Sequence, residues 1–180
     1  MKKAVKGKLR VLFVCTGNTC RSPMAEGILK KLLEDKGVGN LEVSSAGTHG
    51  LSNAPASLFA MEVAGDRNID LSGHRSRRLT AGMIDNADLI LAMSQEHLDY
   101  IKRIGGTAGD RTFLLKAFPQ VNSASNKGRN GGVLSIEDPI GGSPDDYQRS
   151  FADIEKEIKR ILPKLLSSAK AGHFRDTSRS

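Results

Sequence analysis

The chain has 180 residues, of which 38% are hydrophobic and 26% are charged, and its formal net charge is +7. These values fit a single globular domain with a sizeable core, and no apolar run approaches the length of a membrane span. Two cysteines without a secretory signal argue against a disulfide framework, so we expect a cytoplasmic protein.

The positive charge is concentrated near both ends of the chain and in the segment HRSRR at residues 74–78. Nucleic-acid binding would place exposed aromatic residues beside such charge, and aromatic residues make up only 4% of the chain. We therefore expect no nucleic-acid or membrane partner, but an attraction to anionic substrates. We also expect no metal site, because the cysteines and histidines do not stand at ligand spacing. The histidines are His49, His74, His97 and His173.

The N-terminal half alternates apolar strands with helix signals. In chain order, we expect a loose basic tail at 1–8, a strand at 10–14, a helix from 22 to 37, a strand at 41–46 and a helix from 55 to about 67. The first helix has Ser22 as its expected N-cap and Pro23 at its first helical position, and Gly37 is expected to end it.

The C-terminal half continues the alternation. We expect a short helix at 81–86, a strand at 88–93, a helix capped by Ser94, a strand at 112–118, a flexible loop at 120–135, a last helix to about 168 and a disordered tail at 169–180. The last helix begins at Ser143-Pro144, with acidic residues in its first turn, and we expect Pro163 to kink it.

This order of elements predicts one α/β domain over residues 9–168. Strands alternating with helices imply a three-layer architecture, in which a four-stranded parallel doubly wound sheet has helices on both faces. Ligands of such folds bind at the carboxyl ends of the strands, near the switch point of the topology. Cys15 stands at that end of the first strand.

The segment that follows this strand predicts a phosphate cradle. It joins a strand end to a helix N-terminus, whose free N–H groups and partial positive charge bind anions. Gly17 permits a positive φ and Asn18 tolerates one, so the amides of the loop can turn inward, while Arg21 adds a planar fork for two phosphate oxygens. The predicted phosphate-binding residues are Thr16, Gly17, Asn18, Thr19, Cys20, Arg21 and Ser22.

The partial positive charge of the helix N-terminus is also expected to act on Cys15. A thiol at a helix N-terminus beside Arg21 is expected to have a lowered pKa, and Ser22 can donate a hydrogen bond to the thiolate. Cys15 is thus a candidate nucleophile at the base of an oxyanion cradle. The alternative is a buried core cysteine at a strand end, with Ser22 acting only as a cap.

A nucleophile of this kind needs a proton donor for the leaving group. Asp138-Pro139 fits that role, because the proline biases Asp138 toward an extended backbone and a Gly-Gly loop follows. Glu137 is the nearest rival acid, and the sequence does not choose between the two. Asp138 beginning an ordinary turn is the remaining alternative.

At this point the sequence resembles the low-molecular-weight protein phosphatase family. The resemblance spans about residues 9–168 and implies hydrolysis of phosphorylated proteins through a phosphocysteine, with no metal or organic cofactor. It implies that Cys15 is the nucleophile, that Arg21 clamps the phosphate, and that Asp138 is first the general acid and then the base. Asn18 and Ser22 would order the loop. The matching segments are VLFVCTGNTCRSPMAE, SSAGT, DLSGHRSR, DLILAM and EDPIGGS.

Within that family, Thr19 and the acid loop bear on the substrate. Tyrosine-directed members usually carry an aliphatic residue at the position of Thr19, whereas the bacterial protein-arginine phosphatases carry threonine there and Gly-Gly in the acid loop. The resemblance therefore favours phosphoarginine, with phosphotyrosine as the alternative. Ile140 stands where arginine phosphatases usually have Phe, and HRSR at 74–77 is closer to tyrosine-directed members, so Thr19 and Ile140 are the predicted specificity residues.

Cys20 leaves two alternatives open. It can pair with Cys15 under oxidation, which would protect the thiolate, or it can be a small residue packed under the loop. Arsenate reductases of this fold need further cysteines downstream, and none follows Cys20. A non-catalytic oxyanion-binding or adaptor protein is the remote alternative function.

Overall fold

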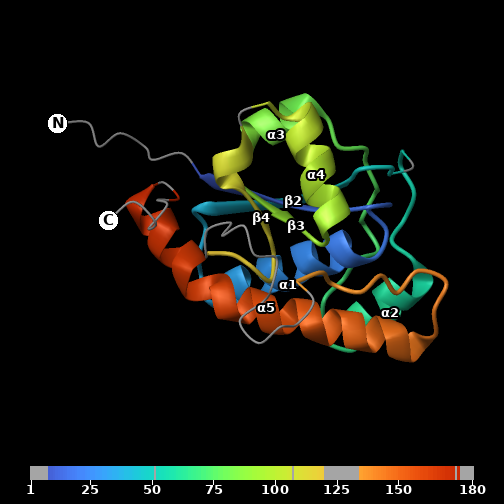
Figure 1. Ribbon diagram of the computed structural model, residues 1–180. Coiled ribbons are helices and arrows are strands. Elements are labelled where there is room, and N and C mark those ends of the chain that lie inside the picture. The colour runs from blue at the N-terminus through green and yellow to red at the C-terminus, as the bar shows by residue number, and fades with distance from the viewer. Residues whose placement is uncertain (1–7, 51, 107, 120–133, 173, 175–180) are drawn as a thin grey trace.

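The computed structural model describes residues 8–50, 52–106, 108–119, 134–172 and 174 (Figure 1). Most of the predicted flexible loop at 120–135, the predicted basic tail at 1–8 except residue 8, and residues 175–180 of the predicted C-terminal tail lie outside the described residues. Within the described ranges, no helix is long and apolar enough to cross a membrane.

Four parallel strands form one sheet, in the order β2-β1-β3-β4. The strands are β1 (Leu9–Cys15), β2 (Leu41–Gly47), β3 (Leu89–Ala92) and β4 (Thr112–Leu114). β2 pairs with one edge of β1 and β3 with the other, so successive connections of the chain lead to opposite sides of β1. The carboxyl end of β1 is therefore the switch point of the sheet. Cys15 is the last residue of that strand and pairs with Gly47 of β2.

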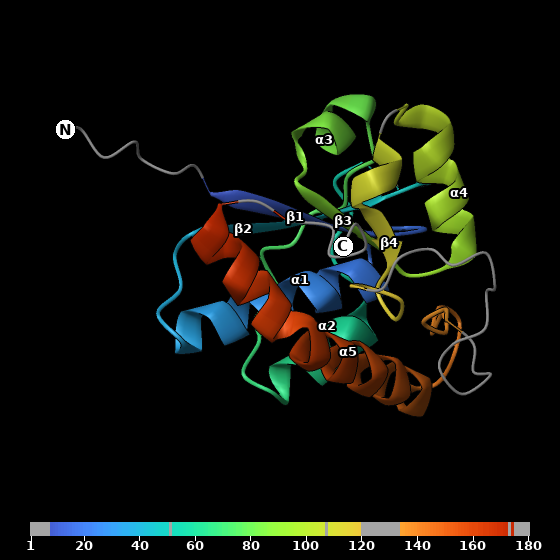
Figure 2. The same ribbon diagram turned by 60° about the vertical axis from the view of Figure 1, so that its left-hand side comes forward.

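Helices cover both faces of this sheet (Figures 1 and 2). They are α1 (Arg21–Asp35), α2 (Leu58–Gly65), α3 (Ala81–Asn86), α4 (Gln95–Ile104) and α5 (Pro144–Ala171), with a 3-10 turn η1 (Ala108–Arg111) before β4. Side chains alternate across β1, so Phe13 packs in the core under α1 and α5 while Leu12 and Val14 pack under α3 and α4. The three-layer prediction is confirmed.

The second helix is shorter than predicted. It begins at Leu58 rather than at residue 55, because the preceding residues bond to other segments. Ser57 N donates to Thr19 O at 2.8 Å, Ala54 N donates to Ser76 Oγ at 3.0 Å, and the Ser57 side chain caps α2 by accepting from Ala60 N. The chain before α2 is therefore bonded to the loop that follows β1, through Thr19, and to the segment around Ser76.

The ends of β4 and α5 also differ from the predicted ones. β4 ends at Leu114 rather than at residue 118, because the chain then turns, with Ala117 N bonded to Leu114 O at 2.9 Å. α5 starts at the predicted Ser143 capping box, passes through Pro163 as one element, and ends at Ala171 rather than near residue 168. Gly172, with a left-handed φ of 80°, terminates it.

Candidate active site

Two loops meet at the carboxyl ends of β1 and β3. The phosphate loop, residues 15–22, runs from the last residue of β1 into the first turn of α1. The acid loop, residues 136–142, is tied to the sheet by a hydrogen bond of 2.7 Å from Ile136 N to Met93 O, just beyond β3. Segments more than a hundred residues apart in sequence therefore share one site, as the switch-point rule predicts.

Cys15 lies at the base of the phosphate loop and is only 2% exposed. Its Sγ lies 2.9 Å from Ser22 Oγ and accepts a hydrogen bond from Asn18 N at 3.3 Å. Burial raises the pKa of the Cys15 thiol, while the hydrogen bonds from Ser22 and Asn18 and the charge of Arg21 act in the opposite direction. The expectation of a lowered pKa was wrong in its net direction, because the sequence does not reveal how completely the thiol is desolvated.

Ser22 is not the N-cap that the sequence predicts. The first helical residue is Arg21, two positions before the predicted Pro23, and Cys20 occupies the N-cap position without a side-chain capping bond to any described residue. The Ser22 hydroxyl is buried inside the first turn, where it contacts the Cys15 thiol and accepts from Asn18 Nδ2 at 2.9 Å. The Ser22 hydroxyl therefore contacts the Cys15 thiol and does not cap the helix.

Asn18 holds the phosphate loop in its curved form. Its φ is 55°, in the left-handed region, and its side chain is fully buried. Nδ2 donates to Ser22 Oγ and Ser45 Oγ, both at 2.9 Å, while Oδ1 accepts from Arg77 N at 2.9 Å and the backbone oxygen lies 2.7 Å from His74 Nε2. The predicted ordering role fits this geometry, and three of the partners, Ser45, His74 and Arg77, were not among the predicted site residues.

Arg21 is a buried guanidinium (4% exposed) between the two loops. Nη2 donates to Asp138 Oδ2 at 2.5 Å and to Thr16 Oγ1 at 3.3 Å, and Nη1 donates to Ile136 O at 3.1 Å. No acceptor among the described residues bonds to Nε, which is itself buried. An unpaired buried donor on a cation is costly, so this site favours an anion that can accept from Nε.

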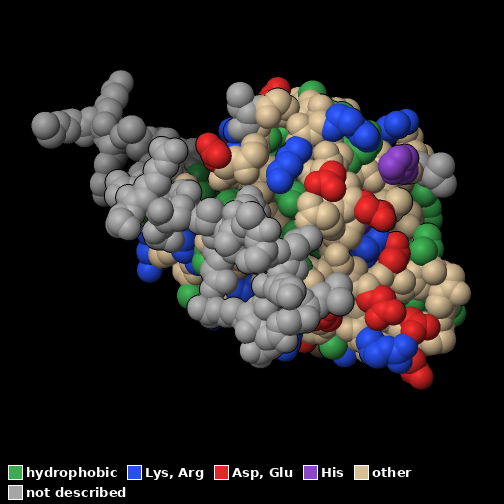
Figure 3. Space-filling view, in the orientation of Figure 1, with side chains coloured by type: hydrophobic (Ala, Val, Ile, Leu, Met, Phe, Trp, Pro, Cys, Tyr) green, Lys and Arg blue, Asp and Glu red, His purple; other side chains and the backbone are tan. Residues whose placement is uncertain are grey.

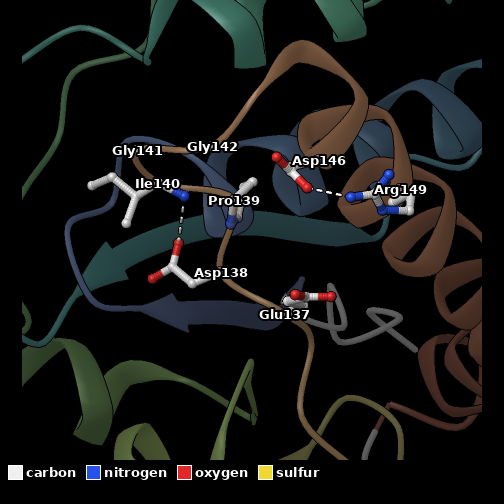
Figure 4. A pocket seen from close by; sticks show the side chains of 8 residues that line it. All are labelled: Glu137, Asp138, Pro139, Ile140, Gly141, Gly142, Asp146 and Arg149. Carbon is white, nitrogen blue, oxygen red and sulfur yellow. Dashed lines mark hydrogen bonds and ion pairs between the residues drawn. The ribbon is translucent and has the colours of Figure 1, made fainter.

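The acid loop places Asp138, and not Glu137, against this arginine. Asp138 Oδ1 accepts from Ile140 N at 3.2 Å, and its side chain is 36% exposed. In Figure 4 the Glu137 carboxylate points away from that of Asp138, and its backbone oxygen accepts from Ser150 Oγ at 3.3 Å. A cavity of about 260 Å³ lies beside the loop. Its lining residues are Glu137, Asp138, Pro139, Ile140, Gly141, Gly142, Asp146 and Arg149.

The second cysteine lies under the loop. Cys20 Sγ is 3.3 Å from Ser57 Oγ and 3.3 Å from Tyr147 OH, and the Thr19 hydroxyl is 3.6 Å from the same sulfur. Burial is the main cause that raises the pKa of Tyr147. Both Cys15 and Cys20 are free thiols, so the packing role expected for Cys20 is compatible with this geometry.

Side chains of both charges lie on the surface of the molecule. On the face seen in Figure 3, most acidic side chains lie in the right half of the view, and basic side chains lie above and below them. The segment at 74–78, which carries three arginines, contributes His74 and Arg77 to the support of Asn18. Within the described ranges, no group of three or more His, Cys, Asp or Glu residues could hold a metal ion.

Cys15 Sγ accepts from Asn18 N and contacts the Ser22 hydroxyl, and Arg21 bonds to Asp138 close by. This arrangement fits a cysteine-dependent protein phosphatase, a hydrolase, and the relatives of the chain are enzymes of that class. The chain belongs to the low molecular weight phosphotyrosine protein phosphatase family, whose model matches residues 10–171.

Known proteins similar to this chain include phosphatases of two kinds. A protein-arginine-phosphatase of Bacillus subtilis (strain 168) is 37% identical over 155 residues, which cover 86% of this chain and 95% of that protein. The low molecular weight protein-tyrosine-phosphatase Etp of Escherichia coli (strain K12) is 36% identical, over 86% of this chain and 93% of that protein. A solved structure of a YwlE arginine phosphatase mutant with a phosphorylated active-site serine superposes with a TM-score of 0.78 at 33% identity, covering 90% of this chain and 99% of that one.

Proposed function

We propose that this protein phosphatase hydrolyses phosphoarginine in proteins in preference to phosphotyrosine, with Cys15 as nucleophile, Arg21 as phosphate clamp and Asp138 as general acid and base. The observation that carries the preference is the half-buried Thr19 hydroxyl in the phosphate loop. A phosphoguanidinium presents N–H donors beside its phosphate, so a hydroxyl and a carboxylate can both accept from it. An aliphatic side chain at this position could not.

The first chemical step transfers the phosphoryl group to the protein. Cys15 Sγ attacks phosphorus, the S–P bond forms, and the P–N bond of the substrate breaks. Asp138 gives its proton to the departing nitrogen, because guanidine leaves poorly unless that nitrogen is protonated. The amides of the loop, the unpaired Nε of Arg21 and the start of α1 stabilise the charge on the three equatorial oxygens.

The second step releases phosphate. A water molecule attacks the phosphocysteine, Asp138 accepts its proton, and the S–P bond breaks to give inorganic phosphate and the Cys15 thiolate. Ser22 and Asn18 N, which contact Sγ, favour the thiolate as leaving group. The similar YwlE arginine phosphatase mutant, whose active-site serine is phosphorylated, supports a covalent phosphoenzyme as the intermediate.

Phosphotyrosine is the second candidate substrate, and two observations favour it. His74 and Arg77 of the HRSR segment, which resembles that of tyrosine-directed members, bond to Asn18 under the loop. Ile140, 65% exposed beside Asp138, replaces the Phe usual in arginine phosphatases, so the wall over the substrate side chain differs. A non-catalytic phosphate-binding protein is the remote alternative.

The expected partners are phosphorylated proteins, and no nucleic-acid partner is expected, because aromatic residues make up only 4% of the chain. The proposed location is the cytoplasm, which is supported by the free thiols of Cys15 and Cys20, since a reducing compartment keeps a nucleophilic thiol active. Oxidation that joins Cys15 to Cys20 remains a proposal for the protection of the nucleophile.

The test compares turnover of a phosphoarginine peptide and a phosphotyrosine peptide by the wild type and by Thr19→Ile. We expect the wild type to have a higher kcat/KM for the phosphoarginine peptide than for the phosphotyrosine peptide. Thr19→Ile should lower the kcat/KM for phosphoarginine relative to that for phosphotyrosine by about tenfold, the equivalent of one hydrogen bond to a charged group. Faster phosphotyrosine turnover by the wild type would overturn the preference. Cys15→Ser should abolish both activities, and turnover near the wild-type level would overturn the mechanism.

A further inference from the structure

We propose that His97 is a positioning residue for the reaction, because it orients the Thr16 hydroxyl as the acceptor that fixes the guanidinium of Arg21. The inference rests on the proposed role of Arg21 as phosphate clamp. It does not depend on whether the substrate is phosphoarginine or phosphotyrosine. From the sequence, His97 was noted only as one of the histidines that do not stand at metal-ligand spacing.

His97 lies in the first turn of α4, on the opposite face of the sheet from α1, and is 2% exposed. Its Nε2 lies 2.8 Å from Thr16 Oγ1, and its Nδ1 lies 3.0 Å from Ser94 Oγ. Thr16 Oγ1 in turn accepts from Arg21 Nη2 at 3.3 Å. A continuous chain of hydrogen bonds therefore joins the start of α4 to the arginine at the centre of the site.

These contacts admit two tautomers of His97, and the proposal takes the one in which Nε2 accepts. The guanidinium only donates, so Thr16 Oγ1 is an acceptor toward Arg21, and its own hydrogen is free for another partner. If that hydrogen goes to His97 Nε2, the lone pairs of Thr16 face Nη2, and Nδ1–H donates to Ser94 Oγ. In this tautomer both ring nitrogens of His97 and the Thr16 hydroxyl have a hydrogen-bond partner. The Ser94 hydroxyl is then bound to His97 rather than to the backbone of α4, in agreement with its missing side-chain cap bond among the described residues.

The imidazole is held neutral, as this arrangement requires. Burial, the charge of Arg21 and the charge of His49 lower the pKa of His97 to about 4. The other groups around the ring are those lining a cavity of about 160 Å³ that opens beside it. They are Thr16, Thr48, His49, Glu96, Asp99, Tyr100 and Arg103. A neutral Nε2 accepts from Thr16 without adding a second positive charge next to the clamp.

The alternative is that His97 only stabilises the start of α4 through Ser94. Two substitutions separate the roles, because they keep different ends of the ring's hydrogen bonding. His97→Gln keeps a polar atom near the position of Nε2 and can still contact Thr16, whereas His97→Asn keeps one near Nδ1 and can contact only Ser94. Each variant is assayed with a generic aryl phosphate, and inorganic phosphate is the competitive inhibitor.

We expect His97→Asn to lower kcat/KM about five- to tenfold and to raise the inhibition constant of inorganic phosphate by the same factor, while His97→Gln stays within about twofold of the wild type. Alkylation of Cys15 by neutral iodoacetamide should be unchanged in both. A purely structural role would instead spare phosphate affinity in the folded His97→Asn protein, and that result would overturn the proposal.

A double-mutant cycle tests whether His97 acts on Arg21 through Thr16. It includes Thr16 variants as well as His97 variants, so the test does not rest only on whether the His97 variants fold. Thr16 is exposed, so Thr16→Val should fold, and we expect it to lose the same five- to tenfold, with Thr16→Ser retaining the activity. In the Thr16→Val background, His97→Asn should cost less than twofold further. Additive losses, or a Thr16→Val enzyme with unchanged phosphate affinity, would overturn the proposal. If Arg21→Lys binds phosphate as the wild type does, the clamp itself is wrong.

Discussion

In the phosphate loop, Asn18, Arg21 and Ser22 are buried and bond to several segments, whereas in the acid loop Glu137, Asp138 and Ile140 are exposed. Asn18 alone contacts Ser22, Ser45 and Arg77 through its side chain. In the acid loop, Asp138 bonds to Ile140 N of its own loop and to Arg21. The two loops touch each other through Arg21, which pairs with Asp138 and with Ile136 O.

This difference matches the two kinds of work that the reaction requires. Stabilising phosphate oxygens needs donors fixed before the substrate arrives, because preorganised dipoles do not have to be reoriented during the reaction. An acid that first gives and then takes a proton must exchange partners. A phosphate dianion competes with the Asp138 carboxylate for the Arg21 guanidinium, and an exposed loop lets the carboxylate turn to the leaving group.

The largest expected effect breaks the acid loop and spares the cradle. Asp138→Ala should lower kcat by about 10²–10⁴, the usual contribution of general acid–base catalysis. The inhibition constant of inorganic phosphate should stay the same or fall, because Arg21 loses a competing carboxylate. Steady-state kinetics measure both quantities.

Glu137→Ala is the matched control for this change, since it removes a neighbouring exposed carboxylate that has no hydrogen bond to Arg21 among the described residues. We expect its kcat within about twofold of the wild type, in line with surface substitutions of little energetic consequence. If Glu137→Ala loses turnover and Asp138→Ala keeps it, the acid is Glu137.

The second prediction breaks the cradle. Asn18→Ala removes three buried hydrogen bonds and leaves a residue with a side chain at a φ of 55°, so we expect a loss of about 2–4 kcal/mol in the free energy of unfolding. Urea unfolding followed by circular dichroism measures it. Asn18→Gly removes the same bonds but tolerates the positive φ, so it should lose about 1 kcal/mol less. An Asn18→Ala protein as stable as the wild type would contradict the role of this hub.

The smallest effect sharpens the comparison within the cradle. Ser22 supplies the largest of the interactions that lower the pKa of Cys15, so Ser22→Ala should raise that pKa further. Because the thiolate is the nucleophile, the pH dependence of Cys15 alkylation by iodoacetamide should move to higher pH. Below the new midpoint, the alkylation rate should fall by roughly tenfold for each pH unit of that movement.

Ser45→Ala controls for the loss of an Asn18 partner. Ser45 Oγ accepts from the same Asn18 Nδ2, but the hydrogen bonds of the Cys15 thiol are to Ser22 and Asn18. In Ser45→Ala, the pH profile of Cys15 alkylation should therefore keep the wild-type midpoint. Equal shifts in Ser22→Ala and Ser45→Ala would mean that the loop geometry, and not the Ser22 hydroxyl, sets the reactivity of the thiol.

The sequence by itself determined the parts of the site that lie next to each other in the chain. A strand, a small polar loop and a helix start within residues 10–23 fix Cys15 and Arg21 on one cradle, because backbone geometry alone carries the chain from one to the other. The strand and helix patterns also determined the layers of the fold, since their periods of 2 and 3.6 residues are local properties. The Asp-Pro pair identified the acid loop but did not choose between Asp138 and Glu137.

Tertiary structure decided what depends on distant segments. It buried Cys15 and thereby reversed the expected direction of its pKa, and it turned Ser22 from a helix cap into a partner of the thiol. It brought Arg77 to Asn18 across 59 positions of sequence and His97 to Thr16 across 81. Desolvation and hydrogen-bond partners are set by which elements pack together around the sheet, and a pattern read along the chain contains no measure of that packing.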